Sequence, residues 1–105
     1  MRTPISPFRP IHGSTIQLPA TTTSSRVAIP AIALPATTIR ILHTTGSSGV
    51  RWRSGSSTVT ALTLVDTQQP PGAIEVDGIN AGDTHIAVIT DSGTGTIEVT
   101  FGSGA

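Results

Sequence analysis

The chain has 105 residues and a formal net charge of zero, from six arginines against six aspartates and glutamates. Valine, isoleucine, leucine and phenylalanine supply 26 residues, which excludes a disordered chain and allows one small hydrophobic core. The absence of cysteine excludes disulfides and thiol chemistry. The neutral balance gives no general attraction to nucleic acid or to an anionic membrane, so neither is an expected partner.

Residues 1–13 form a proline-rich segment, with Pro4, Pro7 and Pro10 spaced by three. Each proline lacks a backbone donor, so helix and central strand are both disfavoured and an extended arm is predicted. The arm either docks on a neighbouring surface or is a frayed terminus. The residues predicted to make its contacts are Ile5, Phe8, Arg9 and Ile11.

Residues 14–105 are rich in β-branched side chains; the whole chain has 19 isoleucines and valines against five leucines. This composition favours pleated strands over helices. Short apolar or alternating runs recur about every ten residues between turn signals, which is typical of an antiparallel β-sandwich or jelly-roll-like domain. Eight strands are predicted, at 14–18, 26–34, 38–44, 50–53, 58–65, 73–76, 85–90 and 96–101.

Two of these predictions depend on turn chemistry. Pro30 interrupts its run, which indicates an edge strand or a bulge. The sequence 91–95, Asp-Ser-Gly-Thr-Gly, predicts a hairpin loop that joins the last two strands. The longest apolar stretch, 27–36, contains two prolines and is shorter than the roughly 20 residues that a membrane-spanning helix needs.

Alternation with a period of two predicts which side chains enter the core. Trp52 falls on the opposite face from Arg51 and Arg53, so we expect the tryptophan in the core and the two arginines on the solvent or partner face. The last two strands supply further apolar positions. The predicted core residues are Trp52, Ile86, Val88, Ile97, Val99 and Phe101.

Catalytic and metal-binding patterns are weak in this sequence. His12, His43 and His85 are far apart in the chain, and no Gly-x-Ser-x-Gly elbow is present. The mild carboxylate cluster between Glu75 and Asp91 fits Asx turns better than a calcium loop. We therefore predict a non-enzymatic protein without a cofactor or a metal, whose function is surface contact.

Residues 26–104 resemble a group of small structural proteins of tailed bacteriophages. The resemblance lies in five short signatures: 34–41 (Leu-Pro-Ala into Thr-Ile-Arg-Ile), 50–53 (a tryptophan between arginines), 71–76 (Pro-Gly-Ala-Ile-Glu-Val), 82–89 (Gly-Asp-Thr-His-Ile-Ala-Val-Ile) and 95–104 (Gly-Thr-Ile-Glu-Val-Thr-Phe-Gly-Ser-Gly). The last two are the most specific. The chain departs from the group at 43–49, where a longer loop replaces an Asn-Asp-Gly type of turn.

That group resembles capsid decoration or cement proteins, which are small β-sandwich or jelly-roll subunits on the outside of the phage head. The resemblance implies binding across major capsid subunits, a homotrimer, and a place on the outer surface of a virion assembled in the host cytoplasm. The alternatives are another virion part, such as a head fibre base, a head–tail joining protein or a tail component, and a recognition module for a glycan or cell surface.

Overall fold

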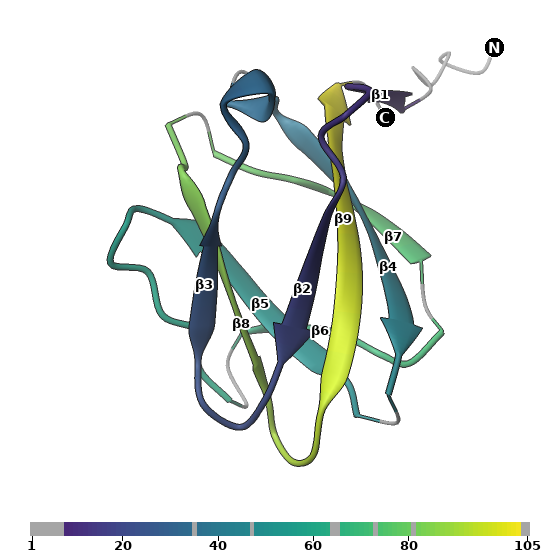
Figure 1. The fold of residues 1–105 in the computed structure, drawn as a ribbon, viewed down its shortest axis with the longest axis vertical. Helices are drawn as coiled ribbons and strands as arrows, with labels where there is room; N and C mark the ends of the chain where they lie inside the picture. The colour runs from purple at the N-terminus through teal and green to yellow at the C-terminus, as the bar shows by residue number, and fades with distance from the viewer. Residues whose placement is uncertain are drawn as a thin grey trace, which may run out of the picture.

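The computed structural model describes residues 8–34, 36–46, 48–63, 66–72, 74–80 and 82–103. In these residues nine short strands form two antiparallel sheets that face each other, which confirms the predicted all-β sandwich (Figure 1). The first sheet holds β1 (Arg9–Pro10), β2 (Ile16–Ala20), β9 (Gly95–Ser103), β4 (Thr38–Thr45) and β7 (Ile74–Gly78). The second sheet holds β3 (Ser25–Ala28), β8 (His85–Thr90), β5 (Val50–Gly55) and β6 (Thr67–Gln69).

The long strand β9 organises the first sheet. On one side it pairs with β4, and on the other it pairs with β2 and, further along, with the two-residue strand β1. Strand β7 then pairs with β4 and forms the far edge. The second sheet runs β3–β8–β5–β6, so β8 is its central apolar strand.

The predicted hairpin between the last two strands is wrong. Strands β8 and β9 belong to different sheets, and the loop between them crosses from one layer to the other (Figure 1). Both strands already have two neighbours, because β3 and β5 flank β8 while β4 and β2 flank β9. The turn residues therefore bend the chain as predicted, but they connect layers and not paired strands.

Two other strand predictions need correction. The predicted strand at 58–65 is not a strand over its described residues, 58–63. The strand of this region is β6, at Thr67–Gln69, which was not predicted. The predicted strand at 26–34 ends at Ala28, after which Pro30 precedes a 3-10 turn, η1 (Ala31–Ala33). Proline fixes its own backbone and has no donor for a sheet ladder, so the extended run stops there.

The core lies between the two sheets. All six residues predicted for it are buried; Trp52 keeps 8% of its surface exposed, and the others keep 1% or less. Leu18, Ile39 and Ile41 join them from the first sheet. Alternation places them there because every second side chain of a sandwich strand faces the opposite sheet.

The described part of the proline-rich arm contacts its own sheet. Arg9 and Pro10 pair with Ser103 and Gly102 of β9. The Ile11 N–H then donates to the Phe101 carbonyl at 2.7 Å, and its side chain packs against the core. Ile5 lies outside the described residues. Residues 9–11 are therefore part of the sandwich.

Candidate interaction surfaces

Residues 56–63 and Asp66, which we call the strap, cover the outer face of the second sheet. Val59 and Ala61 pack on Ala87 and Ile89, which β8 turns away from the main core. The Ser24 Oγ accepts a 2.9 Å hydrogen bond from the Ala61 amide. The strap, at the left side of Figure 1, thereby covers outward apolar side chains of β8.

Arg53 fixes the end of the strap. Its Nε and Nη2 donate to the Asp66 Oδ1 at 2.8 and 2.7 Å. The other carboxylate oxygen of Asp66 accepts from the Leu62 amide at 2.6 Å. Because one carboxylate receives both a guanidinium and a backbone amide, the strap closes on the sheet through charge-assisted bonds.

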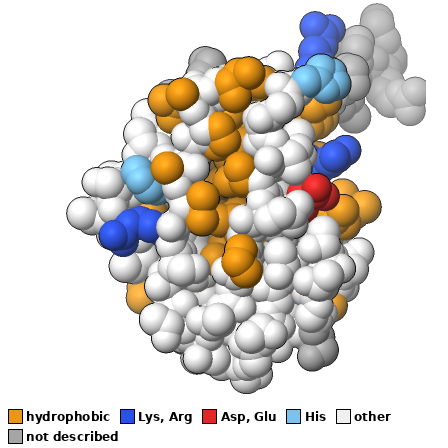
Figure 2. Space-filling model, in the orientation of Figure 1, with side chains coloured by type: hydrophobic (Ala, Val, Ile, Leu, Met, Phe, Trp, Pro, Cys, Tyr) orange, Lys and Arg blue, Asp and Glu red, His pale blue; other side chains and the backbone are white. Residues whose placement is uncertain are grey.

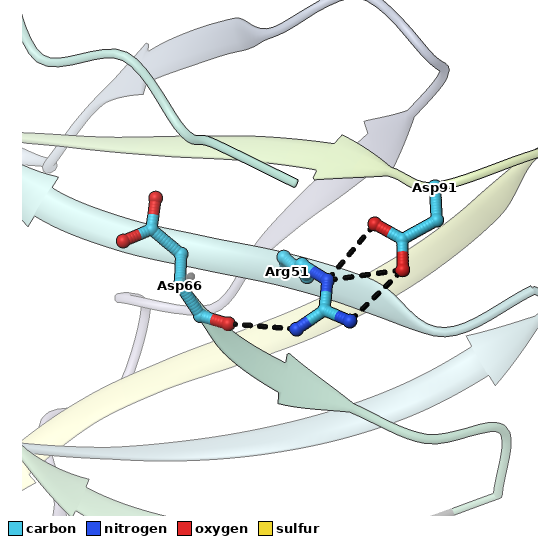
Figure 3. Close-up of polar contacts among 3 residues, drawn as sticks. All are labelled: Arg51, Asp66 and Asp91. Carbon is cyan, nitrogen blue, oxygen red and sulfur yellow. Dashed lines mark hydrogen bonds and ion pairs between the residues drawn. The ribbon is translucent and has the colours of Figure 1, made fainter. Parts of the chain in front are cut away.

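Arg51 reaches two different segments, as Figure 3 shows. Its Nε and Nη2 donate to the Asp91 carboxylate at 2.9 Å, and its Nη1 donates to the Asp66 carbonyl at 3.0 Å. The pKa of Arg51 lies above its ordinary value, chiefly because the Asp91 carboxylate accepts hydrogen bonds from it. The negative charges of the Asp91 and Asp66 carboxylates raise this pKa further. The arginine thus links the strap to the loop after β8.

These contacts change the interpretation of Arg51 and Arg53. The sequence places both on the solvent or partner face, and the structure does find them on the outer side of β5. Their guanidinium groups, however, bind Asp66 and Asp91 of the same chain. They serve first to hold the strap, and Trp52 between them is too deeply buried for its ring to stack on a sugar at the surface.

The loop at 43–49, where the chain departs from the phage group, is tied to its own sheet at its described residues. The His43 Nε2 lies 2.7 Å from the Ser48 carbonyl, and the His43 side chain is buried. Gly46 has a φ of +92°, and a Cβ there would lie 2.6 Å from the Thr94 carbonyl. The loop therefore packs closely on the connection between β8 and β9.

Strand β7 points its apolar side chains outward, away from the core between the two sheets. Ile74 and Val76 are 65% and 41% exposed, whereas Glu75 and Asp77 between them are only partly exposed. The register explains the placement, because Glu75 and Asp77 lie beside the buried Ile41 and Ile39 of β4. An inward carboxylate at an edge discourages strand-to-strand pairing, while the exposed isoleucine and valine mark the outer face as a contact surface.

Leu42 and Arg40 extend this outer face onto β4. Leu42 lies beside Ile74 on one side and Glu98 on the other. Arg40 lies beside Val76 on β7 and Thr100 on β9. The Arg40 side chain is exposed and makes no hydrogen bond or ion pair with any residue that the structure describes. We call Arg40, Leu42, Ile74, Val76 and Glu98 the β4–β7 face.

Hydrophobic side chains also gather elsewhere on the surface. Figure 2 shows a band of them that descends from the region of η1 over the side where β2 and β3 lie. Ile32 within η1 and Leu34 directly after it are 56% and 44% exposed.

The interior holds polar groups without partners. Gln69 is completely buried, and neither its amide nitrogen nor its amide oxygen has a hydrogen-bond partner among the described residues. The Trp52 Nε1 and the Asp77 Oδ2 are in the same situation. Such groups lower the stability of the folded protein, because they lose their hydrogen bonds to water and gain none in return.

Clusters of side chains that could bind a metal ion are not found in the part of the chain that the structure describes. There, no group of three or more histidines and carboxylates is placed to hold a metal ion. Asp83 instead accepts from the Ser54 hydroxyl at 2.6 Å and from the backbone N–H of Asn80, three residues before it, at 3.2 Å, so its carboxylate joins a local turn to β5. The described residues also include no helix long and apolar enough to cross a membrane.

Comparison with known proteins gives the fold. No protein-family model matches the chain, and no curated protein sequence matches it. A solved structure from Bacillus endospore appendages, described as a novel family of disulfide-linked pili, has a TM-score of 0.51 at 16% identity and covers 93% of this chain and 88% of its own. The coat protein of Tobacco streak virus gives a TM-score of 0.41 at 8% identity, over 90% of each chain. This chain contains no cysteine and cannot form the disulfides of the pili.

Proposed function

We propose that this chain is a non-enzymatic structural subunit of a bacteriophage virion that decorates and cements the capsid by binding across major capsid subunits. The proposal includes self-association, for which the phage resemblance implies a trimer, and a place on the outer surface of the particle. It draws on the sequence signatures and on a sandwich fold that is shared with an appendage subunit.

The observation that carries the proposal is the outward apolar side of β7. Ile74 and Val76 belong to the Pro-Gly-Ala-Ile-Glu-Val signature, and both are exposed on a solvent-facing sheet surface. Their burial against another protein would release water from apolar area, which is the main driving force of protein association. A cement protein needs such a surface, because it gains stability for the shell only through contacts.

Repetition of the contact would make weak binding effective. A subunit that holds one site weakly binds far more tightly when an oligomer engages several equivalent sites at once. A capsid offers equivalent sites at regular spacing. Self-association and capsid binding therefore support each other in this proposal.

The test is quantitative mass spectrometry of purified virions from the phage that encodes the chain, combined with antibody labelling in electron microscopy. A copy number comparable to that of the major capsid protein, with label on the head, supports decoration. A few copies per particle, with label at the neck or tail, would assign the chain to another virion component. Absence from purified virions would overturn the proposal.

The fold shared with pilus-forming appendages favours one second candidate, a subunit of a fibre or filament. The same preparation distinguishes it, because a fibre subunit forms elongated assemblies that electron microscopy shows directly. In a fibre, each subunit contacts the next head to tail, so the assembly does not close. A closed oligomer in solution would count against this candidate.

A further inference from the structure

We infer that the β4–β7 face is a two-fold contact between copies of this chain, in which Arg40 of each copy binds Glu98 of the other. The inference goes beyond the proposed function and does not depend on it. A two-fold contact closes a dimer and not the trimer that the phage resemblance implies, and it covers Ile74 with a second copy in place of the shell. It commits to a second copy because the face carries, beside its apolar residues, one carboxylate and one guanidinium that has no partner among the described residues.

The register gives the layout of the face. Across the sheet, one row reads Glu98, Leu42, Ile74, and the next row reads Thr100, Arg40, Val76. Glu98 and Arg40 therefore stand on a diagonal, on neighbouring strands and in neighbouring rows. Leu42 stands at the corner between them.

A two-fold axis in the plane of this face can exchange the two charges. When the axis passes over Leu42 and close to Ile74, the Arg40 position of one copy falls on the Glu98 position of the other. The leucines and isoleucines of the two copies then meet near the axis, and two Arg40–Glu98 pairs flank them. This is an isologous contact, in which each partner supplies the same surface.

The groups needed for this pairing are free or easily released. The Arg40 guanidinium has no partner among the described residues. The Glu98 Oε1 accepts one exposed hydrogen bond of 3.1 Å, from the side-chain amide of Gln17. Arg51 and Arg53, by contrast, already bind carboxylates within the chain. The charge complementarity of the face thus lies in Arg40 and Glu98, which form no ion pair within the described part of the chain.

Charge reversal tests the pairing on the purified full-length chain, with sedimentation velocity across a concentration series. We expect a dimer for the wild type. Arg40→Glu and Glu98→Arg each place like charges together and raise the dimer dissociation constant about tenfold or more. The double variant Arg40→Glu/Glu98→Arg restores the opposite charges and returns the constant toward the wild-type value.

A second pair of variants keeps the test independent of any folding defect in the charge variants. Ile74→Ser removes an exposed isoleucine from the face, and Ile32→Ser removes one of similar exposure from the region of η1. We expect only Ile74→Ser to weaken the dimer. Circular dichroism confirms that each variant is folded.

Several outcomes would overturn the inference. These are a wild type that stays monomeric at all concentrations, an oligomer that neither charge reversal nor Ile74→Ser weakens, and a double variant that remains as weak as the single ones. A monomer whose Ile74→Ser variant loses binding to capsids would assign the face to the shell and not to a second copy. Virion composition tests the proposed function separately, so the two can fail independently.

Discussion

The Ser14 hydroxyl satisfies the backbone of Phe101, 87 positions away in the chain. Its Oγ accepts from the Phe101 N–H at 3.2 Å and donates to the Ile11 carbonyl at 2.6 Å. Ser14 is fully buried in the gap between β1 and β2, where neither of these two strands pairs with Phe101 of β9. One side chain therefore replaces a missing bond of the sheet ladder.

Replacement of Ser14 by alanine should destabilise the sandwich. Ser14→Ala leaves the buried Phe101 N–H without this partner, and we expect the free energy of unfolding to fall by about 1–3 kcal/mol. Urea denaturation measures it. The exposed Ser92 provides the control, since Ser92→Ala should change stability by less than about 0.5 kcal/mol. Equal effects at the two serines would contradict the role of the Ser14 hydroxyl.

Gln69 should be replaceable by an apolar side chain with a gain in stability. Gln69→Met keeps a similar shape and removes two buried polar atoms that have no partner among the described residues. We expect the free energy of unfolding to rise by about 1–3 kcal/mol, the penalty of the unmade bonds. Thermal unfolding gives the sign directly.

The neighbouring Gln68 is the matched control for this change, because it is exposed on the same strand. Gln68→Met should leave the melting temperature nearly unchanged. A lower melting temperature for Gln69→Met would show that the buried amide is satisfied in solution, for example by ordered water.

Asp66 should control the closure of the strap. Asp66→Asn removes the charge that Arg53 binds, and it weakens the acceptor for the Leu62 amide. We expect a loss of about 1–3 kcal/mol, because the Asp66 side chain is only 8% exposed and its bonds are charge-assisted. Hydrogen exchange at the Ala61 and Leu62 amides should accelerate.

Asp91→Asn serves as the comparison for the strap. This change removes the negative charge that Arg51 binds, and it leaves the Arg53–Asp66 ion pair intact. Exchange at Leu62 should therefore stay close to that of the wild type. If both variants accelerate Leu62 equally, the strap is held by the sheet as a whole and not by Asp66.

Alanine substitutions at two glycines distinguish the cost of backbone strain from the cost of a steric clash. Gly46 and Gly72 both have positive φ, at +92° and +75°. Nothing lies within 4 Å of a Cβ at Gly72, whereas a Cβ at Gly46 would meet the Thr94 carbonyl. Gly72→Ala should cost about 1–2 kcal/mol from strain alone, and Gly46→Ala about 1–3 kcal/mol more. Equal costs in chemical denaturation would mean that the 46–49 loop can move away from Thr94.

The sequence alone determined the fold class and the inward faces of the best-patterned strands. Alternation placed Trp52 inside and Arg51 and Arg53 outside, and it placed Ile97, Val99 and Phe101 in the core. Such patterns are local, because they depend only on the two-residue repeat of a strand and on the turn residues at its ends.

Strand partners and surface contacts were decided by the tertiary structure. Whether β8 and β9 form a hairpin depends on which strands occupy their edges, and those strands come from distant parts of the chain. The outward turn of Ile74 and Val76 follows from the register of β7 on β4, because a shift of one residue would exchange its two faces. The local pattern predicts that Arg51 points outward. Its ion pair with Asp91, however, forms between residues that are 40 positions apart in the chain. A local repeat can predict the direction of a side chain, whereas its partner is fixed only when the whole chain packs.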